Sequence, residues 1–172
     1  VSMSSTIGVQ NIAHTNGTNA MTIASDGSVS MTGHVLQVKF TSSADTYQTA
    51  STSYVSSGQF IQITPKSTSS KILLHYSSSC YNNTSAGFVI STIYRNITSS
   101  TNGATAISGG TDLSGRGPTG YGLAYHYSQT NTQIIPLTSQ FLDSPNSTSQ
   151  QTYVLAFKSI NAGTSYWNSN NS

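Results

Sequence analysis

Residues 20–31, AMTIASDGSVSM, predict a β-hairpin, because Asp-Gly stands between two apolar alternations. A two-residue loop at Asp26 and Gly27 would mix polar and apolar side chains on both faces of the hairpin. A three-residue loop that starts at Ser25, with Gly27 in the left-handed conformation of a bulged turn, separates them. The register that follows has one apolar face, built from the pairs Ile23–Val29 and Met21–Met31.

This apolar face requires another apolar surface to pack against. Two strands with four apolar side chains of modest size are marginally stable in water. The first 34 residues contain no Phe, Tyr or Trp that could cover them. We therefore predict that residues 1–34 form an attachment and trimerisation segment, whose apolar face contacts another copy of the chain. The predicted interface residues are Met21, Ile23, Val29 and Met31.

The composition is that of an all-β protein. Serine and threonine make about a third of the 172 residues, charged residues make 6%, and glutamate is absent, whereas roughly a quarter of the residues of an average protein are charged. Strong helix formers are scarce, while Thr, Val, Ile and Tyr, which suit a pleated and half-buried surface, fill the apolar runs. The 10 Tyr and 5 Phe residues bury large areas, so a thin sandwich core is feasible although hydrophobic residues make only 35%.

Residues 35–172 are a series of short strands separated by turns at intervals of about 8 to 12 residues, which is typical of a β-sandwich. Ser56–Gly58 predicts a turn, the glycine-rich Ser108–Gly120 predicts a long loop, and Pro136, which lacks an N–H donor, predicts an edge strand. We therefore expect an antiparallel, jelly-roll-like β-sandwich over residues 35–172. The predicted strands are Val35–Phe40, Tyr47–Val55, Phe60–Thr64, Lys71–Tyr76, Phe88–Arg95, Tyr121–Tyr127, Ile134–Thr138, Thr152–Lys158 and Gly163–Trp167.

Charge and cysteine content disfavour several classes of protein. The six Lys and Arg residues are dispersed singly and the net charge is +2, so no basic surface for nucleic acid is expected. One cysteine, Cys80, cannot form an internal disulfide, so the chain is not a disulfide-stapled secreted scaffold. We expect no signal peptide and no membrane insertion, because a basic start is missing and no apolar run approaches about 18 residues.

A set of motifs runs along most of the chain. It comprises Asn16–Ile23 with Asp26–Val29, Leu36–Val38, Ile63–Pro65 with Ser70–Leu74, and Asp143–Pro145 before the strand at Tyr153. Together these motifs resemble small fibre-type structural proteins of tailed bacteriophages, particularly those of marine bacteria. The resemblance implies a protein of the virion surface on a tail fibre, a head fibre or a decorated capsid. Such proteins are usually homotrimers that attach by their first segment and display a β-sandwich, and the resemblance implies no catalytic residues.

Few residues could carry out catalysis. Aspartate in a turn accepts hydrogen bonds from local backbone donors, and turns or loops are where we expect all four acidic residues, Asp26, Asp45, Asp112 and Asp143. A glycosidase pair formed by Asp112 and Asp143 has no positive support in the sequence. Gly115–Pro118 is not a phosphate loop, because the Lys-Ser/Thr ending is missing. We therefore predict that the chain is no enzyme and holds no cofactor.

The four histidines lack the close spacing of a helical zinc site, and one cysteine is too few for a structural zinc cluster. His75 and His126 fall on predicted strands and could meet across a sheet, although an exposed or hydrogen-bonded histidine fits the pattern as well. His14 and His34 could form a metal or anion site if three copies met at an axis. No metal site is predicted within one chain, and Cys80 fits a small buried filler.

A row of tyrosines is the remaining candidate site. Tyr121, Tyr125 and Tyr127 alternate along one predicted strand, with Leu123 between them. Stacked tyrosines bind sugar rings, which present apolar faces and hydroxyls. The periodicity nevertheless favours burial of the row in the sandwich core or at a subunit interface. Trp167 could cover a strand edge or contact a neighbour, and the sequence does not decide between these roles.

These inferences predict a bacteriophage virion structural protein without enzymatic activity. It would be a homotrimeric surface appendage, a fibre or a capsid decoration, that binds other virion proteins and contributes to host adsorption. The alternative is a carbohydrate-binding module or adhesin domain that recognises cell-surface glycans through the tyrosine row and the loop Ser108–Gly120. The absence of glutamate disfavours a third class, a polysaccharide-degrading spike. The sequence leaves open whether the protein sits on head or tail.

Overall fold

The structure is a computed structural model that describes residues 8–27, 29–31, 33–116, 120–129 and 133–168. The chain divides into two compact units, Val1–Val38 and Lys39–Ser172. Within the described ranges every strand pairing is antiparallel and there is no helix, so the predicted all-β class is confirmed. Accordingly, no helix in this part of the chain has the length and hydropathy to cross a membrane.

The first unit contains a three-stranded sheet, sheet A, in the order β1-β2-β3. Its strands are β1 (Asn11–Ala13), β2 (Asn19–Ile23) and β3 (Val29–Met31). Gly27 has a φ of 79° and its N–H donates to the Ala24 carbonyl over 2.9 Å, which closes the turn. The register is the predicted one, with the pairs Met21–Met31 and Ile23–Val29.

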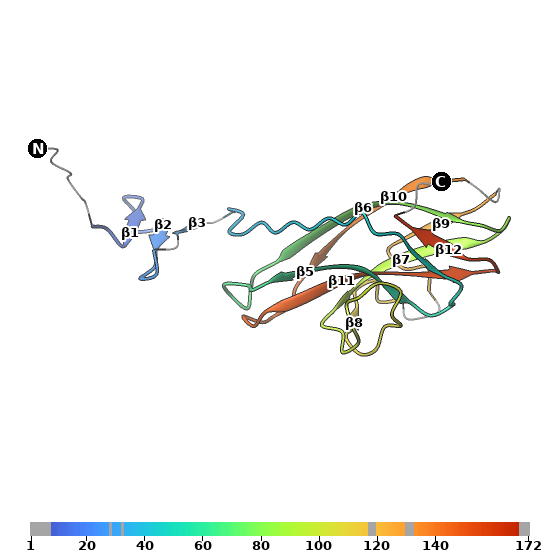
Figure 1. The fold of residues 1–172 in the computed structure, drawn as a ribbon. Coiled ribbons are helices and arrows are strands. Elements are labelled where there is room, and N and C mark those ends of the chain that lie inside the picture. Colours follow the sequence, from blue (N-terminus) through green and yellow to red (C-terminus); the bar gives the residue numbers. More distant parts are fainter. Residues whose placement is uncertain (1–7, 28, 32, 117–119, 130–132, 169–172) are drawn as a thin grey trace, which may run out of the picture. The chain divides into compact units, whose positions relative to one another are not determined.

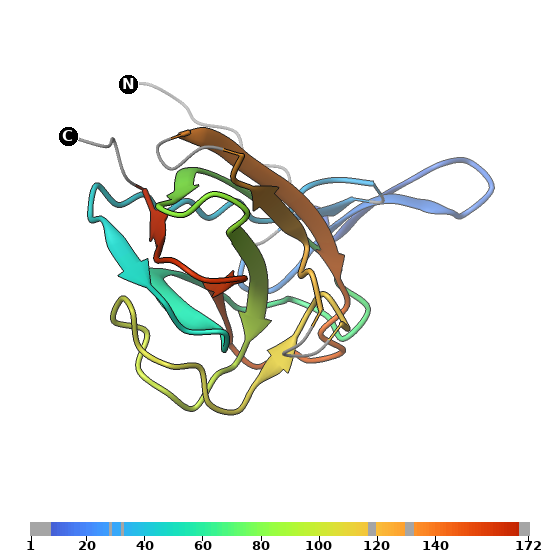
Figure 2. The same ribbon diagram turned by 90° about the vertical axis from the view of Figure 1, so that its right-hand side faces the viewer.

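The second unit is a sandwich of two sheets (Figure 1), which Figure 2 shows in a view along the strands. Sheet B has the order β10-β6-β12-β4, and sheet C has the order β5-β11-β7, with β8 and β9 paired to the same edge of β7. The strands are β4 (Tyr47–Thr49), β5 (Val55–Ile63), β6 (Ile72–Asn82), β7 (Phe88–Arg95), β8 (Thr111–Asp112), β9 (Ala124–Tyr127), β10 (Ile135–Asp143), β11 (Gln151–Ile160) and β12 (Ser165–Trp167).

Alternation places the core between the sheets, as β6 illustrates. Ile72 and Leu74 are buried and Leu73 and His75 are exposed, which is the predicted division of this strand. Trp167 is fully buried in the core, so it neither covers a strand edge nor contacts a neighbouring chain. Its ring lies 5.6 Å from that of Phe157 and 6.3 Å from that of Tyr76 between ring centroids. Other core members are Val55, Cys80, Val89, Ile93, Leu113, Leu137, Tyr153 and Leu155.

Two sequence expectations about strands are wrong. Ser56–Gly58 is no turn, because it lies inside β5, where the pairing with β11 shifts register between Val154 and Ala156. Gly58 has a φ of 72°, so the glycine that suggests a turn instead permits a bulge in a continuous strand. Val35–Phe40 forms no strand, and the division between the two units falls after Val38 instead of after residue 34.

The glycine-rich excursion after β7 is held against sheet C. The loop that carries β8 lies on the outer side of this sheet (Figure 1). β8 pairs with Tyr94 and Arg95, and Leu113 just beyond it is buried. This part of the predicted loop Ser108–Gly120 is therefore no free tip. Pro136 lies on β10, an edge strand of sheet B, as its missing N–H predicts.

Candidate functional site

The three predicted tyrosines lie together around one phenylalanine. Antiparallel pairing sets Tyr127 opposite Phe88, and Tyr125 lies two residues before it on the same face of β9. The centroid of the Phe88 ring is 4.8 Å from that of Tyr127, 5.8 Å from that of Tyr121 and 6.1 Å from that of Tyr125. The rings of Tyr121 and Tyr125 are 5.3 Å apart. We call these four residues the aromatic cluster.

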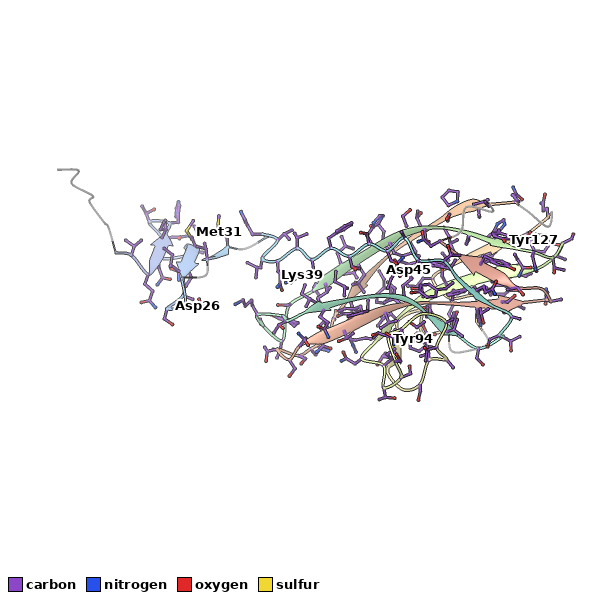
Figure 3. The ribbon with its side chains drawn as sticks, viewed as in Figure 1. Asp26, Met31, Lys39, Asp45, Tyr94 and Tyr127 are labelled. Carbon is purple, nitrogen blue, oxygen red and sulfur yellow. The ribbon has the colours of Figure 1, made fainter. Side chains whose placement is uncertain are left out.

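The tyrosines of the aromatic cluster are exposed, so the expectation that they fill the core of the sandwich is wrong. Their exposed fractions are 49% for Tyr121, 56% for Tyr125 and 43% for Tyr127. Side chains do alternate along β9, but the tyrosines point to solvent and His126, which lies between Tyr125 and Tyr127, is buried. Figure 3 places Tyr127 at the end of the sandwich opposite Lys39.

Phe88 is the member that sequence reasoning missed. It begins the most apolar predicted strand, but its partner across the sheet depends on a long-range pairing with β9. Half-buried Phe88 packs against all three tyrosines, so it holds their rings side by side at a solvent-exposed surface. Such a surface offers apolar ring faces together with phenolic hydroxyls, which suits either a sugar ring or a subunit contact.

Comparisons with family models, curated proteins and solved structures give no match. The roles of these residues therefore rest on their own geometry and chemistry.

Asp143 is held in a buried ion pair. The Arg95 guanidinium donates to both carboxylate oxygens of Asp143, over 2.8 and 2.6 Å, and the Tyr153 hydroxyl donates to the same carboxylate over 2.7 Å. Asp143 is buried at the end of β10, so the expectation that it serves local turn donors is wrong. This ion pair closes one end of the sandwich by joining strands of sheets B and C.

Asp112 and Asp45 behave as turn residues, as predicted. Asp112 accepts hydrogen bonds from the backbone N–H and the hydroxyl of Ser114, both over 2.9 Å, and from the Thr92 hydroxyl over 2.7 Å. Asp45 accepts a hydrogen bond from Ser43 two residues before it. The bonds to Ser114 are those of a turn aspartate, and the bond from Thr92 joins this turn to β7.

Lys158 is fully buried beneath the β8 loop, on the outer side of sheet C. Its ammonium lies 4.5 Å from the ring centroid of Tyr54, a cation–π contact. Burial lowers the pKa of Lys158, and burial followed by the nearby carboxylate of Asp112 raises the pKa of Tyr94 to about 12. The same two causes raise the pKa of Tyr54. Tyr54 and Lys158 are buried, and together with the half-buried Asp112 and Tyr94 they anchor the loop to sheet C.

The histidines lie apart. His75 is on β6 in sheet B and His126 is on β9 in sheet C, so the expectation that they could meet across one sheet is wrong. Burial lowers the pKa of His126, whose Nε2 has no hydrogen-bond partner in the described structure. Among the described residues, no group of three or more His, Cys, Asp or Glu side chains could hold a metal ion.

Cys80 is fully buried in the core, as expected for a small filler. Burial raises the pKa of its thiol to about 12, so the reactive thiolate is scarce at neutral pH.

The predicted interface residues lie on one face of sheet A. Ile12 pairs with Met21, and Met21 pairs with Met31, so all three share a face with Ile23 and Val29. Val29 and Ile12 are exposed, and Met21 and Ile23 are only partly covered. None of the described residues from 8 to 38 is buried, so the described part of this unit has no core of its own.

The sandwich also has an apolar groove between β5 and β6, with a volume of about 450 Å³. The core residues Leu74, Ile93 and Leu155 line it from the inside. Residues 39–43 and 59–61 line its rim. No sequence signal indicates this groove, because it depends on how β5 and β6, which belong to different sheets, are placed in the folded sandwich.

Proposed function

We propose that this chain is a bacteriophage virion structural protein, a homotrimeric appendage of fibre or capsid-decoration type at the virion surface. The observation that carries the proposal is sheet A, which presents an apolar face and has no buried residue among those described. A small sheet of this kind needs an apolar surface to pack against before it is stable. A second and a third copy supply that surface, and the resemblance of the motifs to phage fibre-type proteins makes three the expected number.

The strand order of the sandwich supports a jelly roll. If β8 is set aside, the two sheets contain four strands each, β4-β12-β6-β10 and β5-β11-β7-β9. The chain passes from one sheet to the other at every connection between these strands except the one from β7 to β9. This order agrees with the two Greek keys of a jelly roll, an architecture that viral capsid and lectin domains use. Because a fold alone does not determine function, we use this agreement only as support.

The mechanism of the appendage is valency. Three identical sandwiches on one support bind a surface far more tightly than one, because the second and third contacts form at high effective concentration. With charged residues at 6% of the chain, contacts of this protein depend little on ion pairs. Its binding to virion partners is therefore expected to be insensitive to salt.

The mass of the purified chain in solution tests the assembly. We expect three times the 18.1 kDa of one chain at micromolar concentration. A monomer at that concentration would contradict the trimer. Labelling of intact particles of the encoding phage with an antibody against residues 39–172 tests the location, and a signal on soluble protein only would remove the virion assignment.

A second function, recognition of cell-surface glycans, is favoured by the aromatic cluster. Its three exposed tyrosines offer stacking faces and hydroxyls without a pocket that would restrict the ligand to one size. The variant Tyr125→Ser is expected to weaken adsorption to host cells and binding on a glycan array while the mass stays unchanged. Leu142→Ser, at an equally exposed apolar residue of β10, is the control. Loss of the oligomer in Tyr125→Ser would assign the cluster to a subunit interface instead.

A further inference from the structure

One edge of β6 is unpaired along most of its length. β10 pairs with β6 from Ile72 to Cys80, whereas β12 covers the other edge only from Cys80 to Asn82. The backbone N–H of Asn168 donates to the Ser79 carbonyl over 2.8 Å, which shows that Ser79 directs its backbone groups to this second edge. Alternate residues of a strand point their backbone groups to the same side.

Leu73, His75 and Ser77 therefore direct their N–H and C=O groups to the edge that β12 does not reach. Within the described part of the chain, these groups make no backbone hydrogen bond on that side. An edge with free donors and acceptors is a template for another strand. The apolar groove lies beside this edge, and Leu73, His75 and Ser77 are among its lining residues.

Val35–Phe40 has the pattern of the missing strand. Leu36, Val38 and Phe40 alternate with Gln37 and Lys39, so a strand formed here would carry three apolar side chains on one face. In the structure these side chains are unprotected, with 81% of Val38 and 85% of Phe40 exposed. Six residues of strand span about 20 Å, and the open edge from Ile72 to Ser77 is also six residues long.

We propose that Val35–Phe40 of a second copy of this chain adds to the open edge of β6 as a strand and directs Leu36, Val38 and Phe40 into the apolar groove. The backbone bonds satisfy the free edge, and the apolar side chains cover Leu74 and Ile93 on the groove floor. The proposal rests on the oligomer proposed above, to which it adds a second contact that reaches the sandwich itself.

Residues 39–43 of the same chain lie at the rim of the groove. The Asn168 side-chain amide donates to the carbonyls of Ser43 and Asp45, over 2.8 and 3.0 Å, and so fixes the path that leads into β4. Phe40, three residues before Ser43, lines the rim but remains exposed. A strand from a second copy fills the groove and leaves these bonds intact.

Cross-linking between two differently marked chains tests the proposal. Gln37→Cys is placed in one chain and His75→Cys in a tagged chain, because both side chains lie on the solvent side of the proposed pair. The two chains are mixed, unfolded, refolded together and treated with a short bis-maleimide, which tolerates a shift of one residue pair in register. We expect a covalent heterodimer. Cys80 is buried and does not react, and Gln129→Cys in place of His75→Cys, at an exposed site beyond β9, is the control.

The double variant Gln37→Cys with His75→Cys in one chain identifies the other arrangement. A cross-link within one chain, without covalent dimers, would show that the chain fills its own groove and would overturn the proposal. A trimeric wild-type mass with no cross-link of either kind would also overturn it, while the oligomer of the proposed function would stand. A monomeric wild type would remove both.

A second pair of variants avoids cysteine chemistry. Val38→Ser with Phe40→Ser changes two exposed side chains, so the single chain keeps its core. Removal of two apolar side chains from a groove should raise the dissociation constant of the oligomer by at least about tenfold. Leu142→Ser, at an exposed apolar residue of β10 that does not line the groove, is the control and should change the dissociation constant less than about threefold. An equal effect of the control and the double variant would contradict the proposal.

Discussion

Replacing Asp143 by Ala should destabilise the sandwich by about 3 kcal/mol, because it leaves the half-buried Arg95 guanidinium without its partner. Asp143 accepts two hydrogen bonds from Arg95 and one from Tyr153. The side chain of Asp143 is 7% exposed and that of Arg95 is 19% exposed. Breaking a buried ion pair from one side costs roughly 3–5 kcal/mol, and the partial exposure of Arg95 places the expected cost at the lower end of this range.

A triple variant separates the cost of a broken pair from the contribution of the pair. In Arg95→Met, Asp143→Leu and Tyr153→Phe together, no charged or hydroxyl group is left without a partner. A buried pair replaced by apolar groups of similar volume is often neutral or stabilising. We therefore expect the triple variant to recover most of the stability that Asp143→Ala loses.

The single Trp167 reports both results, since it is fully buried in the core of the sandwich. Urea unfolding followed by tryptophan fluorescence gives the free energy of unfolding, and an unchanged dependence on urea shows that the unfolding transition is the same. A loss of less than about 1 kcal/mol in Asp143→Ala would refute the reasoning, as would a triple variant no more stable than the single one.

Three further predictions concern assembly, thiol chemistry and the bulge. Ile23→Ser with Val29→Ser should abolish the oligomer, measured by mass, while the fluorescence of the buried tryptophan stays unchanged. Cys80 should resist maleimide at pH 8 until urea unfolds the chain, and stability should fall as pH rises above about 8.5, where the unfolded thiol ionises but the buried one does not. Gly58→Ala should cost about 1–3 kcal/mol of unfolding free energy, because φ is 72° and a Cβ would lie 2.6 Å from the Tyr47 hydroxyl.

Features set by neighbouring residues could be predicted from the sequence. The hairpin register follows from Asp26 and Gly27 together with the alternation beside them, and the structure has the same pairs. The bounds of β7 also agree with the prediction, because this strand is rich in apolar and β-branched residues and lies between turn residues. In each case the deciding interactions lie within a few residues of one another.

Features that depend on distant partners could not be predicted. Gly58 has the sequence signature of a turn, and only the partner strand β11 shows that the chain continues through it as a bulge. Asp143 stands before a proline turn, and its ion pair depends on Arg95, 48 residues away in sequence. The alternation of residues in β9 correctly predicted that the tyrosines share one face. It did not show whether this face points to the core or to solvent, because that depends on the pairing with β7.

Two apolar alternations in the first 40 residues lack cover in the described structure. One is the face of sheet A, and the other is Val35–Phe40, whose strand pattern has no strand in the structure. Apolar residues at every second position indicate that one face of a segment is buried, but they do not indicate which chain covers this face. In the sandwich, one edge of β6 lacks a partner strand, and the apolar groove beside this edge is open. If Val35–Phe40 of each copy pairs with β6 of the next copy, both the unpaired segment and the unpaired edge are explained.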